Sequence, residues 1–208
     1  MMIAVVDYGI GNFGSVIRMI EKVGGSAKLI STPEEIMRAE KIILPGVGHF
    51  DRGMSQILER GLLEPLRDRV MKQNTPIMGI CLGMQLLCAG SEEGALPGLG
   101  FVNADVRRFP ALSNQNLKVP HMGWNTIEVV RNNPLFEVSS DEQRFYFVHS
   151  YYVVPREPGL AIAVASHGVE FCAAFQSRNI LGAQFHPEKS HRFGMALMKR
   201  FVDFSIHA

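Results

Sequence analysis

One cysteine lies where a short apolar run changes into a helical pattern. Cys81 is the centre of Gly-Ile-Cys-Leu-Gly at residues 79–83, after the apolar run that follows Pro76. A sharp strand-to-helix turn holds such a nucleophile above the end of a sheet, and flanking glycines let the neighbouring backbone clear the turn. The helix N-terminus behind the sulfur favours thiolate. The pattern therefore predicts a cysteine nucleophile; a buried packing cysteine is the alternative.

Two residues near the C-terminus could supply the base that a cysteine nucleophile needs. A base and a residue that orients it complete such a site, and the sequence offers His186 and Glu188 on either side of Pro187. Residues i and i+2 of an extended chain face the same side, so we expect Glu188 to hold one ring nitrogen of His186 while Pro187 keeps the segment extended. For this motif alone, a surface histidine beside a carboxylate is the alternative.

The other cysteines and histidines do not predict a metal site. The three cysteines, Cys81, Cys88 and Cys172, include no C-x-x-C pair, and their odd number argues against a disulfide framework. The pair His186 and His191 brackets an acid, but at no spacing that is typical of zinc. We therefore expect no metal and no cofactor, and the free thiols fit the reducing cytoplasm.

Composition and charge bound the class of protein. With 208 residues, 47% of them hydrophobic, the chain suits one α/β domain spanning residues 1–208 with a sizeable core. A net charge of +1 gives no electrostatic basis for binding nucleic acid or an anionic membrane surface. The N-terminus lacks the basic region of a signal peptide, and polar residues and glycines interrupt the uncharged stretch 73–91, so no membrane span is expected.

The chain first alternates strand and helix patterns and then changes character. Strands are expected over 3–7, 27–31, 41–44 and 77–80, with helices over 13–23, from 34, over 54–74 with breaks near Gly61 and Pro65, and over 82–89. This order predicts a parallel sheet with helices on both faces. After residue 91, strands over 104–109, 126–130, 144–154, 161–166 and 170–176 predict an antiparallel extension. A last strand is expected over 180–185, and a terminal helix with Phe193, Leu197, Phe201 and Phe204 on one face should dock on the sheet.

Two glycine-rich loops follow strands of the first half. Residues 9–14 read G-x-G-x-x-G, which is found in dinucleotide sites, but no acid ends the second strand to hold a ribose, so a tight turn is the favoured interpretation. Residues 45–48 (Pro-Gly-Val-Gly) end the third strand at the same sheet edge as Cys81. Free backbone N–H groups beside a nucleophile suit an oxyanion hole, although the loop alone fits an ordinary turn equally well.

Together these motifs resemble the class I glutamine amidotransferases over essentially the whole chain. The elbow at 79–85 and the segment Gln-Phe-His-Pro-Glu at 184–188 carry that resemblance. A narrower resemblance, to the glutaminase subunits of imidazole glycerol phosphate synthases, rests on five further segments: 7–12, 44–48, 91–94, 121–125 and 147–151. It implies the flavodoxin-like amidotransferase fold, a parallel sheet flanked by helices with antiparallel strands in the C-terminal half.

The resemblance also implies a role for each site residue. Cys81 would attack the side-chain amide of glutamine to give a thioester and ammonia, with His186 as base and Glu188 as its orienting acid. The oxyanion would meet the N–H of Leu82 and one from the Val47–Gly48 peptide region. The residues that match the glutamine-binding positions of the family are Gln85, Glu93, His149, Ser150 and Tyr151.

A partner is implied as well, because ammonia released into water would be protonated and lost. The resemblance implies a heterodimer with a (β/α)8-barrel cyclase subunit, which combines the ammonia with a phosphorylated ribulosyl intermediate of histidine biosynthesis. We expect the interface near His121, Met122, Trp124 and Lys189. Trp124 is the single tryptophan and suits an interface anchor, with a core position as the alternative.

Other functions remain open from the sequence alone. The same chemistry could serve another synthase, of the anthranilate or purine pathway. A non-catalytic regulatory module of the same fold is possible in principle, although a complete Cys-His-Glu set argues against it. A dinucleotide oxidoreductase ranks last.

Overall fold

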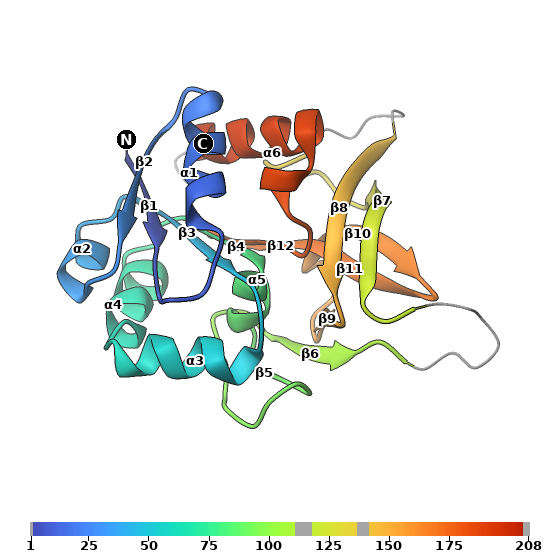
Figure 1. The fold of residues 1–208 in the computed structure, drawn as a ribbon, viewed down its shortest axis with the longest axis horizontal. Coiled ribbons are helices and arrows are strands. Elements are labelled where there is room, and N and C mark those ends of the chain that lie inside the picture. The colour runs from blue at the N-terminus through green and yellow to red at the C-terminus, as the bar shows by residue number, and fades with distance from the viewer. Residues whose placement is uncertain (1, 111–117, 137–141, 206–208) are drawn as a thin grey trace.

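The fold is built on one twisted sheet, seen in a computed structural model that describes residues 2–110, 118–136 and 142–205. The strands run in the order β2-β1-β3-β4-β12-β11-β10-β7-β8, and β5, β6 and β9 form a side branch that joins through β11 (Figure 1). Their bounds are β1 Met2–Val6, β2 Ser26–Ile30, β3 Lys41–Gly46, β4 Ile77–Cys81, β5 Gly90–Ser91, β6 Ala104–Arg108, β7 His121–Val129, β8 Gln143–His149, β9 Tyr151–Pro155, β10 Ala161–His167, β11 Val169–Ser177 and β12 Ile180–Ala183.

The first half of the sheet is parallel, as the alternating sequence pattern predicts. Parallel pairing joins β2, β1, β3, β4 and β12 in that order. On its other edge, β12 pairs antiparallel with β11. The helices between and after them are α1 Phe13–Lys22, α2 Pro33–Met37, α3 Phe50–Glu59, α4 Leu63–Arg67, a π-helical turn Asp68–Lys72, α5 Leu82–Leu86 and α6 His191–Asp203. The carboxyl ends of β3, β4 and β12 meet at one edge of the sheet, which is where Cys81 and the glycine loop lie.

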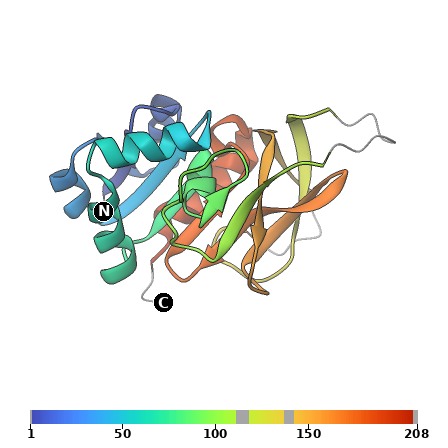
Figure 2. The ribbon, with the colours of Figure 1, turned by 90° about the horizontal axis from the view of Figure 1, so that it is seen from below.

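Strand residues alternate between two apolar layers, one on each face of the sheet. In β1, Ala4 and Val6 belong to the layer under α3, α4 and α5, whereas Ile3 and Val5 belong to the layer under α1 and α6. Figure 1 shows α1 beside α6 on one side and α3 with α4 on the other, and Figure 2 shows the antiparallel strands extending away from them. Strands β1, β3, β4 and β12 are buried on both faces, which explains their apolar sequences, whereas β2 at the edge of the sheet buries only Ile30.

One predicted strand and one predicted helix have different bounds in the structure. The expected strand 144–154 is two strands separated at Ser150: β8 pairs with β7, and β9 pairs with β6 and β11. The expected helix 54–74 begins earlier, at Phe50, where the side chain of His49 caps it by accepting from the Asp51 N–H, and it is interrupted at Gly61. Pro65 does not interrupt a helix, because it lies in the first turn of α4, where its missing N–H is not needed.

The C-terminal helix is fixed to the sheet by a buried lysine as well as by its apolar face. Lys41, at the start of β3, is fully buried and its ammonium donates to the carbonyl oxygens of Phe201, Val202 and Phe204 at 2.7–2.8 Å. These carbonyls lie at the negative end of the helix, so the cation supports the end of α6. In the part of the chain that the structure describes, no helix is long and apolar enough to cross a membrane.

Candidate active site

Cys81 occupies a sharp turn between β4 and α5. Its backbone has φ 53° and ψ −110°, a strained conformation for a residue other than glycine. The flanking glycines are needed for close approach: a Cβ on Gly79 would lie 2.6 Å from the Gly83 carbonyl oxygen, and one on Gly83 would lie 1.7 Å from that of Leu44. The predicted elbow is therefore the observed geometry, with the thiol 6% exposed at the start of a helix.

The structure brings the His186 and Glu188 side chains together as expected, although the backbone between them has a different conformation from the expected one. His186 Nδ1 lies 2.8 Å from Glu188 Oε1, and both side chains are 2% exposed. The segment was expected to be extended, but Pro187–Lys189 is a 3₁₀ turn. Proline favours the first position of such a turn because its φ is already helical, so Pro187 bends the chain and does not keep it straight.

The ring of His186 is held for proton transfer to the sulfur. Burial lowers its pKa, but the hydrogen bond to Glu188 and the electrostatic interaction with Cys81 outweigh that effect and raise the pKa to about 10. In the described part of the chain, its buried Nε2 makes no hydrogen bond, so this nitrogen is left for the thiol proton. The backbone is fixed too, because the His186 N–H donates to the Tyr146 carbonyl and Ser190 Oγ, which accepts from the Tyr146 N–H, donates to the His186 carbonyl at 2.6 Å.

A cavity of about 320 Å³ opens beside the sulfur. Most of the residues predicted for chemistry or for glutamine binding contribute to its wall, and they come from β4, α5, β8, β9 and the loops that join these elements to the rest of the fold. The lining residues are Val47, Gly48, Cys81, Leu82, Gln85, Glu93, Pro120, Val148, His149, Ser150, Tyr151 and His186. The cavity is of a size that admits a single small polar metabolite rather than a polymer.

Glu93 is carried to this cavity by a loop that α3 fixes in place. Its Oε2 accepts from the Phe50 N–H at 2.8 Å, so the carboxylate lies at the positive end of α3. In the same helix, Asp51 accepts from the Ala95 and Leu96 N–H groups at 2.9 and 3.0 Å, which lowers the pKa of its carboxyl group. The predicted binding residue is thus held rigidly, 12 positions beyond Cys81 in the sequence.

Comparison with known proteins decides the family. The class I glutamine amidotransferase family ("Glutamine amidotransferase class-I") matches residues 4–204. An imidazole glycerol phosphate synthase subunit HisH 2 of Pseudomonas aeruginosa is 48% identical over 97% of this chain and 99% of its own length, and one of Methanococcus maripaludis is 49% identical over 97% and 98%. The chain belongs to the class I glutamine amidotransferases, in the group of HisH subunits. It is a glutaminase subunit of imidazole glycerol phosphate synthase.

Structural comparison supports the fold of this amidotransferase. The structure of PurLQS from Thermotoga maritima aligns with a TM-score of 0.68 at 19% identity, covering 96% of this chain and 95% of that one. An α/β sheet that is partly parallel and partly antiparallel, flanked by helices, is therefore the family fold, as the sequence predicts.

The predicted partner-facing residues of the HisH-like chain divide into exposed and buried ones. Met122 and Trp124 are 62% and 41% exposed, so Trp124 is not a core residue; its ring stacks on His191 at 5.5 Å. Lys189 lies over the Tyr146 ring at 5.6 Å on the same face. His121 is only 5% exposed, and its ring contacts His149 and His167.

Sequence reasoning assigned no role to one residue that the structure places at the reaction centre. Gln184 is fully buried, its Nε2 lies 3.9 Å from Cys81 Sγ, and its Oε1 lies 3.1 Å from Gln85 Nε2. The available signal was its position two residues before His186 at the end of an apolar strand, where a polar side chain must find a partner. Cys88 and Cys172 are buried, and desolvation raises the pKa of each thiol, that of Cys172 to about 12. Cys88 was expected on the helix of Cys81, but α5 ends at Leu86.

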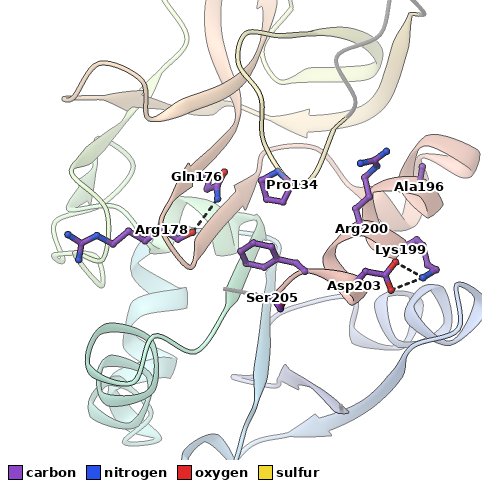
Figure 3. A pocket seen from close by; sticks show the side chains of 9 residues that line it. Pro134, Gln176, Arg178, Ala196, Lys199, Arg200, Asp203 and Ser205 are labelled. Carbon is purple, nitrogen blue, oxygen red and sulfur yellow. Dashed lines mark hydrogen bonds and ion pairs between the residues drawn. The ribbon is translucent and has the colours of Figure 1, made fainter. Parts of the chain in front are cut away.

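A larger hollow, of about 840 Å³, lies far from this chemistry, between the β11–β12 turn and the end of α6. Its cations do not converge: Lys199 is paired with Asp203, and the side chain of Arg178 extends away from Lys199 and Arg200 (Figure 3). In the described part of the chain, no group of three or more His, Cys, Asp or Glu residues could hold a metal ion. The smaller cavity at Cys81 is therefore the candidate active site.

Proposed function

We propose that this glutaminase subunit uses Cys81, His186 and Glu188 as its catalytic triad. The observation that carries the proposal is the buried His186 ring, which is hydrogen-bonded through Nδ1 to Glu188 at 2.8 Å and interacts with Cys81. Because its pKa is raised to about 10, His186 already holds the proton taken from the thiol, and the sulfur attacks the glutamine amide carbon as a thiolate. The proton then goes to the departing nitrogen, ammonia leaves, and a thioester remains. Water activated by His186 hydrolyses the thioester to glutamate and restores the thiol.

Backbone N–H groups stabilise the charge that develops on the substrate oxygen. We propose the Leu82 N–H and one from the Val47–Gly48 region as donors, because these residues line the cavity beside the sulfur. Loss of one such donor costs about 2.7–4 kcal/mol of transition-state stabilisation in comparable enzymes. Glutamine itself binds through Gln85, Glu93 and the 149–151 segment, which form the rest of the wall.

The experiment is ammonia release from glutamine by the full chain, alone and with a ligand-loaded barrel cyclase subunit. Cys81→Ala is expected to abolish release in both conditions with an unchanged circular dichroism spectrum. Cys172→Ala is the matched control, because Cys172 is an equally buried thiol in β11 that does not line the cavity. Retained turnover in Cys81→Ala would contradict the proposal.

We also propose that the chain acts in the cytoplasm as a single domain and delivers ammonia to a (β/α)8-barrel cyclase subunit as a heterodimer. The exposed Met122 and Trp124 beside Lys189 support this docking face, since aromatic side chains are frequent interface anchors. Trp124→Ala is expected to weaken the heterodimer at least about tenfold by ultracentrifugation. The control Val130→Ala removes a side chain of similar exposure, 47%, just beyond the end of β7. Equal weakening by both variants would move the interface elsewhere.

A further inference from the structure

We propose that Gln184 is a positioning residue whose side-chain amide donates a hydrogen bond to the Cys81 sulfur. Its contact with Gln85 allows this amide only one orientation. The inference rests on the proposed function, because it gives Gln184 a role in preparing the nucleophile. It begins from burial. Gln184 is fully buried directly after β12, and its backbone N–H donates to the Ala173 carbonyl at 2.9 Å, so its side chain cannot turn to solvent.

The orientation of both amides follows from one main-chain carbonyl. The Tyr151 oxygen can only accept, so the Gln85 atom 3.0 Å from it must be the donor Nε2. That nitrogen also lies 3.1 Å from Gln184, so the facing Gln184 atom must be the acceptor Oε1. The remaining Gln184 atom, 3.9 Å from Cys81 Sγ, is then the donor Nε2. Each step leaves one arrangement, because reversing either amide would set two donors or two acceptors against each other.

The same carbonyl fixes a third side chain. His149 Nδ1 lies 2.7 Å from the Tyr151 oxygen and therefore carries a proton, which leaves its Nε2 as an acceptor toward His121. The Tyr151 oxygen thus has two donors and no free lone pair. The Gln85 amide cannot turn away from it without leaving a buried carbonyl short of one partner.

An amide N–H at the sulfur has a chemical consequence. It stabilises thiolate relative to thiol, because a hydrogen bond to a charged acceptor is stronger than one to a neutral acceptor. The other titratable groups around the sulfur are the imidazole of His186 with Glu188 behind it, the buried phenol of Tyr8, and Glu93 and His149 in the cavity wall, and the Gln184 variants leave all of them in place. Gln184 adds a neutral donor that no proton transfer removes, so it continues to act after His186 has given up its proton.

Alkylation of Cys81 by iodoacetamide as a function of pH tests this role without glutamine or a partner. The site of reaction is read by mass spectrometry, because Cys88 and Cys172 are buried thiols with raised pKa values. Gln184→Met keeps the side-chain length and removes the donor, so the midpoint of the alkylation profile should rise by about one pH unit, with about tenfold slower reaction below the midpoint. Gln184→Glu keeps an acceptor for Gln85 but sets a charge against the sulfur, so its midpoint should rise further.

Gln85→Met separates the orientation step from the direct contact. The hydrogen bonds of Gln85 in the described structure go to Tyr151 and Gln184 and not to the sulfur, yet its loss frees the Gln184 amide to turn, so a smaller rise in the same direction is expected. The matched control is Asn179→Leu, a buried amide directly before β12 that donates to the Val70 and Thr75 carbonyls at the far end of the same strand. It should leave the profile of the folded protein unchanged.

The outcomes separate this inference from the proposed function. Selective alkylation of wild-type Cys81 with unchanged midpoints in both Gln184 variants would overturn the inference and leave the nucleophile in place. A shift in Gln184→Met with none in Gln85→Met would overturn the fixed orientation. Unselective alkylation of the wild-type chain would instead count against Cys81 as the nucleophile.

Discussion

His186 and His149 line the same cavity, but one ring is positively charged and the other is neutral. The pKa of His186 is raised to about 10, whereas burial lowers that of His149 to about 3 despite its hydrogen bond to the Tyr151 carbonyl. Their partners explain the difference. His186 has the Glu188 carboxylate on Nδ1 and the electrostatic influence of Cys81, both of which favour imidazolium, while His149 has a carbonyl and a second neutral imidazole as partners.

The cavity therefore has a charged wall and a neutral wall. In the charged wall a proton must move between sulfur, His186 and the substrate. In the neutral wall, which runs through Gln184, Gln85, His149 and His121, every hydrogen bond has one fixed direction, because it starts from a carbonyl that can only accept. A mobile proton on one side and a fixed donor set on the other allow the reaction to proceed while the substrate stays aligned.

The largest expected effect comes from removing the charge behind the mobile proton. Glu188→Gln should lower the pKa of His186 and reduce partner-stimulated kcat by about 10⁴-fold, since an amide cannot stabilise the imidazolium and can select the wrong tautomer. Steady-state ammonia release measures kcat, and NMR titration measures the pKa of His186. The control Glu157→Gln alters an exposed carboxylate that accepts from Asn103 and should leave both unchanged. An unshifted His186 titration would contradict the charged-wall assignment.

The charged wall was largely predictable from sequence, whereas the neutral wall was predictable only in part: Gln85 and His149 were expected through the family resemblance and do line the cavity, but Gln184 and the hydrogen bonds that join these side chains were not expected. The elbow around Cys81 and the His186–Glu188 pair are local, so short-range spacing contains them, and even the wrong backbone for Pro187 left the pair correct. Gln184 meets Cys81 across 103 positions and Gln85 meets Tyr151 across 66. Contacts at that separation depend on strand order, which spacing alone does not reveal.

The fold, like the site, was harder to predict where it depends on which strands pair with each other. Apolar runs alternating with helical patterns predicted the parallel half, because β1, β3 and β4 are short apolar strands, each followed by a helix. In the antiparallel half, 144–154 is one stretch rich in aromatic and β-branched residues, and its division at Ser150 reflects different partners for β8 and β9. Pairing partners are tertiary information, so the sequence showed strand content there without its arrangement.

A smaller effect is expected on the pH dependence of stability, to which the neutral histidines His149 and His121 contribute. Unfolded histidine titrates near pH 6.5, while native His149 and His121 titrate near 3 and 4. Between pH 6.5 and 4 the unfolded chain therefore binds more protons, and each such histidine lowers the free energy of unfolding by about 1.4 kcal/mol for every pH unit of acidification. His149→Gln, which cannot titrate, should reduce that slope by about one proton in urea unfolding at pH 6.5 to 4.5. Parallel pH profiles would show that His149 is not held neutral.

The smallest effect should come from the outer end of the neutral wall. Asn125 Nδ2 lies 3.2 Å from His121 Nε2 and 2.9 Å from the Ser166 carbonyl, so it must donate, and His121 must carry its proton on Nδ1 toward His149. Asn125→Ala should cost about 1 kcal/mol of stability and change kcat by less than about threefold. Because the Tyr151 carbonyl still fixes His149, nitrogen NMR should show His149 unchanged and His121 still protonated on Nδ1. If both rings instead populate two tautomers, the direction of the wall is set from Asn125, at the edge beside Met122 and Trp124, and not from the carbonyl at the cavity.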